Sequence, residues 1–396
     1  MKFKNIGIFL AGMAFMGMIN MGANVLQDVK LMTQSRLGHR YEAITNKLTV
    51  IDQLIGRYYL YEDEIETEEL EEILYLGYVA GLGDVYSTYY SATEYKDLME
   101  SFEGSYTGIG SYVSQNMNTG AITLINPFEG GPADLAGIKK DDILVSIDGE
   151  EVTGMDLNMA VSKMKGEAGT DVKVQIYRPS EEAYLDFTIT RAVVEVPTVA
   201  YEMLENGVGY IQLMDFDVIT VEQFKHAVED LKNQGAKSMI FDLRDNGGGL
   251  LNSVSEILDI LLPEGLLVYT EDKEGNRSEL WADDPDCVDL PMVVLVNGNS
   301  ASASELFTGA LRDYEKAEII GTTTYGKGIV QSFFQLTDGS AVKLTTSEYF
   351  TPKGLPIHGI GVEPDIVVEY DSEAENDTQL QAAVDYLTEQ QAKNAE

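Results

Sequence analysis

The sequence predicts an α+β protein of several domains: a helical N-terminal region, a central region of short strands, and a layered α/β core. At 396 residues the chain is long enough for two or three domains. Apolar residues recur at helical spacing through 41–61 and 68–78, whereas strand-like and helical runs alternate from 200 to 370. The apolar and charged fractions, 44% and 23%, are those of an ordinary globular protein.

The charge balance excludes some partners. The chain carries 66 acidic and 27 basic side chains, a formal net charge of -39, which would repel nucleic acid. The densest acidic run, 62–72, is typical of the start of a helix.

The sequence predicts neither a disulfide nor a metal site. Cys287 is the only cysteine, so no intrachain disulfide can form. Because histidine and cysteine clusters are lacking, we expect no metal and no cofactor.

The N-terminus predicts a signal peptide or membrane anchor over residues 1–27. Residues 1–4 are basic, and residues 6–26 are uncharged and largely apolar. About 20 apolar residues suffice to span a bilayer, and no clear small-residue cleavage site follows them. We therefore favour an uncleaved anchor over a cleaved signal. In either case the body of the protein is expected outside the cytoplasm, membrane-anchored or secreted.

Two regions follow with different patterns. Residues 28–101 are expected to be mainly helical, with a break at 81–90. Residues 102–193 contain short strands separated by Gly and Asp turns, and one helix around 155–165. The predicted strands in this region are 121–125, 172–178 and 183–191.

The region 102–193 resembles a PDZ domain, a small β-sandwich-like fold with helices. The resemblance is carried by a Gly-Ile-Gly loop at 108–110, a Pro-Ala-x-x-Ala-Gly-Ile helix at 132–138, and an Asp-Asp-Ile-Leu-x-x-Ile-Asp-Gly hairpin at 141–149. A PDZ domain adds a peptide strand to its own sheet edge and holds the terminal carboxylate on backbone N–H groups. The resemblance therefore implies a peptide-binding site at Gly108, Ile109 and Gly110. Glycines there would let the backbone approach the carboxylate.

The core is expected over 194–372, followed by a helical tail at 373–396. A hairpin turning at Asp338-Gly339 is expected within 329–349. The strands and helices expected before it are 209–213, 220–233, 238–243, 253–262, 292–296 and 304–316.

Alternating serines after the strand at 292–296 raise the possibility of a nucleophile. Ser300, Ser302 and Ser304 lie between that strand and the next predicted helix, the usual place for a hydrolase serine. The three histidines, His39, His226 and His358, have no evident catalytic context. A lysine can replace histidine as the base if burial lowers the pKa of its amine. Lys327, between two glycines and followed by Ile and Val, has the expected surroundings.

Taken together, the chain resembles the carboxyl-terminal processing peptidases, tail-specific serine proteases of family S41 with an embedded PDZ domain. The match covers about residues 40–385. The segment 300–305, SASASE, corresponds to the nucleophile motif, and 325–331, YGKGIVQ, to the base motif. The resemblance implies that Ser302 attacks, that Lys327 is the general base, and that Gln331 orients it. A spacing of four would place the last two on one face of a helix or turn. It also implies a ClpP/crotonase-like α/β core.

A third motif at 242–249, DLRDNGGG, implies an oxyanion hole. Gly248 is favoured as one backbone donor, with Gly247 as second choice, and Ala303 is the other donor. One departure from the family is Val85, where relatives often have proline. No expected catalytic position is altered.

The sequence thus predicts a serine-type endopeptidase outside the cytoplasm that binds unstructured, apolar C-terminal tails of proteins and cleaves them. The resemblance further implies that tail binding to the PDZ domain gates activity. The N-terminal helices and the tail at 377–393 could pair two subunits. One alternative is a catalytically silent PDZ adaptor or chaperone, which would bind tails without cleaving them. Another is a Ser-Lys acyltransferase or amidase acting on cell-wall material, although Ser302 lacks the SxxK pattern.

Overall fold

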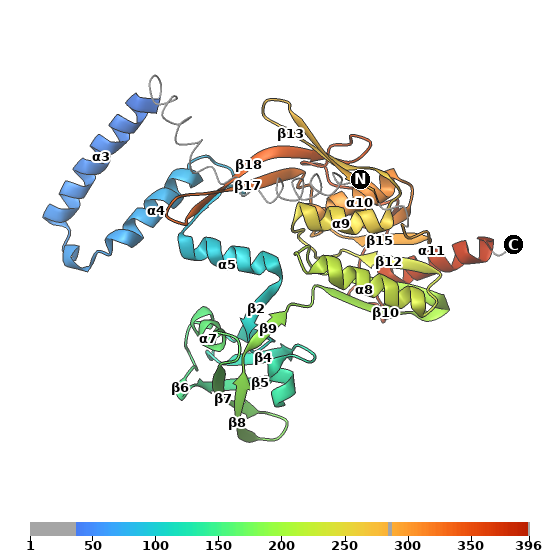
Figure 1. The fold of residues 1–396 in the computed structure, drawn as a ribbon, viewed down its shortest axis with the longest axis horizontal. Helices are drawn as coiled ribbons and strands as arrows, with labels where there is room; N and C mark the ends of the chain where they lie inside the picture. The colour runs from blue at the N-terminus through green and yellow to red at the C-terminus, as the bar shows by residue number, and fades with distance from the viewer. Residues whose placement is uncertain (1–36, 284–286, 395–396) are drawn as a thin grey trace, which may run out of the picture. The chain divides into compact units, whose positions relative to one another are not determined.

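The computed structural model describes residues 37–283 and 287–394 (Figure 1). The chain divides into two compact units. Of the described residues, the first unit comprises 37–98, 270–278 and 329–349, and the second comprises the others. Within the described ranges no helix is both long and apolar enough to cross a bilayer. The signal peptide or membrane anchor predicted at 1–27 lies outside these ranges.

The first unit begins with helices that expose much of their apolar surface. Helix α3 spans Leu37–Tyr58, and α4 spans Thr67–Ala80 after a short 3-10 turn, η1, at Glu62–Glu64. Side chains such as Val50 and Leu54 on α3 are about half exposed. These helices agree with the predicted helical pattern. Part of the acidic run lies in the first turn of α4, where it favours the positive end of the helix dipole.

A β-hairpin completes the first unit. Strand β17 (Ile329–Gln335) pairs antiparallel with β18 (Ala341–Phe350), and β18 pairs with β1 (Thr88–Tyr90). The turn lies at Asp338-Gly339 as predicted, with Gly339 at φ 94°. The tip of a second hairpin, formed by β13 (Gly265–Asp272) and β14 (Arg277–Ala282), also belongs to this unit. The sequence analysis had not predicted that hairpin.

The second unit contains the PDZ-like region. Its main sheet has the order β3-β4-β5-β7-β8, with β6 paired to β5, and β2 pairs with β9. Ile122, Leu124 and Leu144 are among its fully buried core residues. The elements are β2 (Ser105–Gly108), β3 (Ser111–Gln115), β4 (Ile122–Pro127), α6 (Pro132–Ala136), β5 (Asp142–Ile147), β6 (Glu150–Glu151), α7 (Leu157–Met164), β7 (Asp171–Arg178), β8 (Ala183–Thr190) and β9 (Ala192–Glu195). Helix α5 (Ala92–Glu103) precedes β2.

The same unit contains a second sheet, with the order β10-β11-β12-β15-β16-β19. The pair β10–β11 is antiparallel, and the other pairs are parallel. The strands are β10 (Val199–Met203), β11 (Val208–Leu213), β12 (Ser238–Asp242), β15 (Met292–Val296), β16 (Ala317–Gly321) and β19 (Ile366–Val367), with η2 at Glu205–Gly207.

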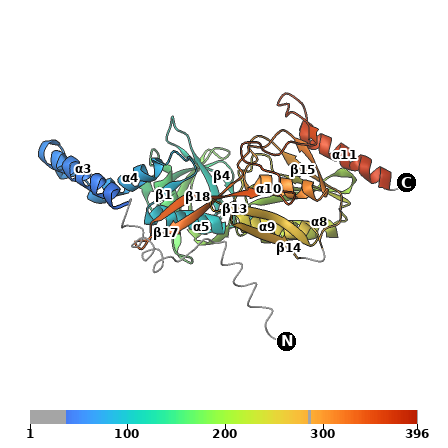
Figure 2. The ribbon, with the colours of Figure 1, turned by 90° about the horizontal axis from the view of Figure 1, so that it is seen from above.

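Helices cover both faces of this sheet. Three lie on one face, where Phe224 of α8 and Phe307 of α10 pack against Phe241 of β12. On the other face, Ala383 and Leu387 of the tail helix join the sheet core. Figure 2 shows this helix on the opposite side of β15 from α8 and α9. The four helices are α8 (Thr220–Asn233), α9 (Leu251–Leu261), α10 (Ala303–Asp313) and α11 (Thr378–Asn394). The layered core and the mixed α+β class are therefore as predicted.

Topology explains why distant motifs come together. The strands β11, β12, β15 and β16 are parallel neighbours, so their carboxyl ends lie along one edge of the sheet. The segments that leave this edge are 214–219, 243–250, 297–302 and 322–328. The last three contain the glycine motif, the serine motif and the lysine motif.

Candidate active site

Ser302 occupies a strained position at the start of α10. Its backbone has φ 55° and ψ -114°, a conformation that residues with a side chain rarely adopt and that costs on the order of 1–3 kcal/mol. Its neighbours hold it there, because Ser300 donates a hydrogen bond to the Leu243 carbonyl (2.8 Å) and Ser304 to the Asn246 carbonyl (2.9 Å). Both flanking serines are fully buried, whereas Ser302 is half-buried. Of the three serines, Ser302 therefore has the geometry of a nucleophile elbow.

Glu305, one turn into α10, joins the serine segment to the lysine segment. It is fully buried, and its carboxylate accepts four hydrogen bonds. Oxygen Oε2 accepts from the backbone N–H groups of Ser302 (2.9 Å) and Lys327 (2.8 Å). Oxygen Oε1 accepts from the Gly326 N–H (2.7 Å) and the Thr324 hydroxyl (2.5 Å). One carboxylate oxygen thus fixes the backbone of both predicted catalytic residues.

Glu305 lies within the predicted nucleophile motif, but no role was predicted for it. The spacing Ser302-x-x-Glu305 is a capping-box pattern, which predicts that the Glu side chain reaches back to the Ser N–H. That signal could have identified the first contact. The contacts with 324–327 arise only from the tertiary fold.

The lysine segment is held to its surroundings by its backbone. Tyr325 donates to the Ser300 carbonyl (3.0 Å), and the Gly326 carbonyl accepts from Gly359 (2.8 Å). Lys327 itself is half-buried. A side chain at Gly328 would collide with the backbone of His358, so the fold brings that histidine close to the lysine segment in space, with its own side chain exposed.

Gln331 does not lie on a helix or turn, so that part of the prediction is wrong. The residue belongs to β17, within the first unit, next to a register shift at Val330/Gln331. A strand forms because 329–335 is paired along its whole length with β18. The Gln331 amide donates to the Thr345 hydroxyl (3.4 Å). Its predicted role toward Lys327 stays a prediction.

The glycine turn after β12 lies directly against Ser302. Gly248 has φ 108°, and a Cβ there would lie 2.8 Å from the Ser302 Cβ and 2.9 Å from the Ala303 nitrogen. Gly249 has φ 149°, and a Cβ there would lie 2.6 Å from the Phe216 carbonyl oxygen. Neither position can accept a side chain. The fold therefore brings two predicted oxyanion residues, Gly248 and Ala303, to the nucleophile.

The Gly248 N–H is already engaged in this structure. It donates to Oδ1 of Asn246 (2.8 Å), and Nδ2 of Asn246 donates to the Leu213 carbonyl (2.8 Å). Asn246 is 1% exposed, so its amide is fixed at both ends. The assignment of Gly248 as an oxyanion donor stays a prediction, and it requires this hydrogen bond to open.

Two acidic residues flank the segment that supports the glycine turn. Phe216 donates to the Gly248 carbonyl (3.2 Å) and accepts from Leu250 (2.7 Å). On either side, burial raises the pKa of Asp215, and burial together with the charge of Asp215 raises the pKa of Asp217 to about 7. The cause is desolvation of the charged form. This pair was not among the predicted site residues.

The predicted peptide-binding residues lie at the end of β2 and in the two-residue connection to β3. Gly108, Ile109 and Gly110 are buried, and Gly110 has φ 74°. The carbonyls of Ile109 and Gly110 accept from the N–H groups of Ala133 (2.7 Å) and Phe128 (3.0 Å). Strand β3, which follows, is at the edge of its sheet. An open edge next to such a loop is the arrangement that strand addition of a peptide requires.

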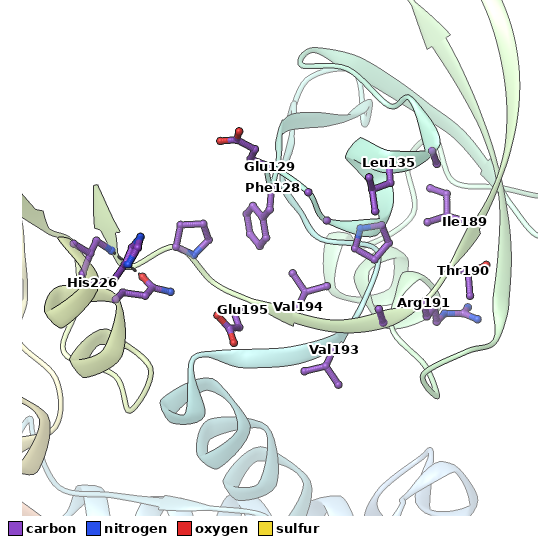
Figure 3. Close-up of a pocket in the computed structure, with 18 of the residues that line it drawn as sticks. Phe128, Glu129, Leu135, Ile189, Thr190, Arg191, Val193, Val194, Glu195 and His226 are labelled. Carbon is purple, nitrogen blue, oxygen red and sulfur yellow. Dashed lines mark hydrogen bonds between the residues drawn. The ribbon is translucent and has the colours of Figure 1, made fainter. Parts of the chain in front are cut away.

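A cavity of about 830 Å³ adjoins the peptide-binding loop, since its lining includes Phe128, whose N–H donates to the Gly110 carbonyl. It is lined by apolar side chains including Phe128, Leu135 and Val194, and by the polar residues Arg191 and His226 (Figure 3). Its lining includes neither Ser302 nor Lys327. In the described ranges, no group of three or more His, Cys, Asp or Glu side chains could hold a metal ion.

Comparison with known proteins agrees with the geometry. The family model for peptidase family S41 matches residues 207–368, and the PDZ domain model matches 128–178. A carboxyl-terminal-processing protease of Synechocystis sp. is 33% identical over 374 residues, 92% of this chain and 86% of the relative. The carboxy-terminal processing protease CtpA of Bacillus subtilis is 35% identical over 319 residues, 80% and 67% of the two chains.

A solved S41 protease structure from Bacteroides fragilis shares the fold. It has a TM-score of 0.51 and 19% identity, and the match covers 78% of this chain and 87% of that one. The family follows from the sequence relatives, which match along most of both chains. This chain belongs to the carboxyl-terminal-processing serine proteases of peptidase family S41.

Proposed function

We propose that the protein is an endopeptidase outside the cytoplasm in which Ser302 and Lys327 form a catalytic dyad. The observation that carries this proposal is the shared carboxylate of Glu305, because its Oε2 accepts from the backbone N–H groups of both residues. A dyad needs its two side chains at a fixed separation. A buried acceptor that binds both backbones supplies that constraint.

The reaction proceeds in two steps. The neutral amine of Lys327 takes the proton of the Ser302 hydroxyl while Oγ forms a bond to the scissile carbonyl carbon. The resulting ammonium then gives this proton to the leaving amine as the C–N bond breaks, which leaves an acyl-enzyme. Water, deprotonated by the same lysine, hydrolyses the ester and restores Ser302. Gln331, at the spacing of the family's orienting residue, would hold the amine of Lys327.

Backbone N–H groups would stabilise the oxyanion of the tetrahedral intermediate. Ala303 lies at the N-terminus of α10. Gly248, in the glycine turn, lies next to the Ala303 nitrogen. Each such donor is worth about 3–4 kcal/mol to the transition state. Since Asn246 holds the Gly248 N–H, an active state requires the turn to shift or Gly247 to take over.

The PDZ-like region would select substrates by their C-terminal tails. An apolar tail would add to the open edge of β3, and its carboxylate would bind at Gly108, Ile109 and Gly110. This proposal rests on the edge position of β3 and on the inward-facing carbonyls of the loop. Binding of tails in this groove would deliver a nearby peptide bond to Ser302.

Residues 6–26 would anchor the chain, with the body outside the cytoplasm. The uncharged stretch after a basic start supports this location. Sodium carbonate extraction and N-terminal sequencing of the mature protein test it, since a cleaved or extractable form would contradict the anchor.

Pairing of two copies would use the exposed apolar side chains of α3 and α4. Helix α11 is not available for this, because its Ala383 and Leu387 are buried in the core of the same chain. Light scattering that finds only monomer would refute the pairing.

A cleavage assay tests the proposed chemistry. The full-length chain in detergent would be incubated with an unfolded reporter that ends in an apolar tail, and the products read by mass spectrometry. We expect cleavage by the wild type and none by Ser302→Ala or Lys327→Ala. His358→Ala is the matched control, since this exposed residue lies near the lysine segment and should keep its activity. Loss of cleavage in His358→Ala with retention in Lys327→Ala would contradict the dyad.

A silent tail-binding adaptor is the second candidate, and the engaged Gly248 N–H favours it. It predicts that the wild type and Ser302→Ala bind the reporter equally and that neither cleaves it. Cleavage by the wild type alone would exclude this function.

A further inference from the structure

Tyr106 lies next to the loop that is proposed to bind the tail carboxylate. It belongs to β2, two residues before Gly108. A Cβ on Gly108 would lie 2.9 Å from the Tyr106 ring, so the ring is packed against this glycine. On the ring, the ammonium of Lys165 lies 5.4 Å from the centroid. Lys165 is the C-cap residue that follows α7, and its Cα would lie 3.6 Å from a Cβ on Gly108.

The polar tip of Tyr106 faces the N–H groups of the same loop. Its hydroxyl oxygen is hydrogen-bonded by the backbone of Ser111 and Gly110, while burial raises the pKa of the phenol. The loop carbonyls of Ile109 and Gly110 point elsewhere, to the N–H groups of Ala133 and Phe128. The loop therefore presents donors to the groove, and a phenol oxygen already lies against two of them.

We infer that Tyr106 is a built-in competitor for the tail carboxylate: its hydroxyl occupies the donors of the loop until a C-terminal carboxylate displaces it. This inference rests on the proposed tail recognition and adds a residue that sets its affinity. A carboxylate oxygen is about the size of a phenol oxygen and accepts stronger hydrogen bonds because it is charged. Lys165 favours the exchange, since its ammonium attracts a carboxylate more strongly than it attracts a ring.

The prediction concerns the removal of a single oxygen atom. Tyr106→Phe keeps the packed ring but frees both N–H groups, so peptides with a free C-terminal carboxylate should bind more tightly. One net hydrogen bond corresponds to about 2- to 12-fold in Kd. A peptide with a C-terminal amide should gain less, because its neutral carbonyl oxygen accepts weaker hydrogen bonds than a carboxylate. Lys165→Met should weaken binding of the free acid only.

Fluorescence anisotropy on the full-length chain in detergent tests this, with Ser302→Ala in every variant so that no peptide is cut. The probe is a short peptide ending in Leu-Ala-Ala, as the free acid and as the amide. Tyr184→Phe is the matched control, since this tyrosine of β8 is 67% exposed. Circular dichroism confirms that each variant is folded.

The outcomes separate the two proposals. Tighter binding by Tyr106→Phe, with a larger gain for the free acid than for the amide, supports the inference. If the wild type prefers the acid to the amide but Tyr106→Phe binds it equally or less well, the inference is overturned and tail recognition stands. If no variant distinguishes acid from amide, tail recognition at this loop fails and the inference fails with it.

Discussion

Replacing Glu305 by glutamine changes one buried atom at the centre of the proposed site. The two side chains have the same shape, but glutamine offers one oxygen and one NH₂ group where glutamate offers two oxygens. The carboxylate accepts four hydrogen bonds, two on each oxygen. If the glutamine oxygen keeps Ser302 and Lys327, its NH₂ group faces the Gly326 N–H, which cannot accept a hydrogen bond.

The magnitude follows from those contacts. Hydrogen bonds to a charged group contribute about 1.5–3 kcal/mol each, and a buried N–H left without an acceptor costs about 1–3 kcal/mol. The Thr324 hydroxyl loses less, because its oxygen can instead accept from the glutamine NH₂ group while it keeps the hydrogen bond from the Val362 N–H (2.7 Å). We expect Glu305→Gln to lower the free energy of unfolding by about 3–5 kcal/mol. That exceeds the effect of most single substitutions.

Activity should fall further than stability alone explains. A displacement of about 1 Å between a nucleophile and its base can cost about 100-fold in rate. We therefore expect kcat/KM for the reporter, and the rate of Ser302 labelling by a fluorophosphonate, to fall at least about 100-fold at a temperature where the variant is folded. Thermal unfolding by circular dichroism establishes that temperature.

The control is Glu229→Gln, which makes the same chemical change at an exposed position on α8. Its stability and labelling rate should match those of the wild type. A labelling rate and a Tm in Glu305→Gln that also match the wild type would refute the role assigned to this carboxylate.

Three further predictions follow from the same site. Lys327→Met and Lys327→Arg should both lose at least about 1000-fold in cleavage rate, while their Tm stays near that of the wild type. Methionine has no amine, and a guanidinium does not deprotonate, so neither can act as the base. Cleavage by Lys327→Arg would contradict the role of Lys327 as general base. Asp217→Asn should be more stable than the wild type by about 2–4 kcal/mol at pH 8 and equal to it near pH 4. The reason is that the pKa of Asp217 is raised from 3.8 to about 7 in the folded state, so the wild type loses stability as pH rises through that window; urea unfolding at both pH values measures this, and a pH-independent difference would argue against it. Gly248→Ala should reduce cleavage at least about 100-fold because its Cβ would meet the Ser302 Cβ at 2.8 Å, whereas Gly77→Ala in α4 meets nothing within 4 Å and serves as the control.

Much of the fold could be predicted because its signals are local. The alternation of apolar strands and amphipathic helices predicted α8 and β15 with the bounds they have in the structure. The Asp338-Gly339 pair predicted the position of the hairpin turn. The hairpin of β13 and β14 was missed. Its turn depends on Asp272 accepting from the N–H groups of Glu274 and Asn276, contacts that the alternation of apolar and polar residues does not indicate.

The candidate site was predicted only in part, because much of it depends on contacts between distant segments. Ser302, Lys327 and Gly248 came from motifs. Glu305 bridges segments about twenty positions apart, and the Asn246 side chain acts on the glycine turn through its link to Leu213. The raised pKa of Asp217 requires burial that no sequence pattern shows. The four-residue spacing between Lys327 and Gln331 suggested a helix or turn, but Gln331 lies in a strand because β17 pairs with β18.

Mapping the site of covalent labelling tests whether Ser302 is the nucleophile and Lys327 its base. The full-length protein would be treated with a fluorophosphonate, digested, and sequenced by mass spectrometry, alongside Lys327→Ala. The account predicts one modified residue in the segment 300–304, Ser302, and a labelling rate that falls at least about 100-fold in the lysine variant. Modification of Ser300, Ser304 or a serine elsewhere, or an unchanged rate in Lys327→Ala, would contradict the Ser-Lys dyad.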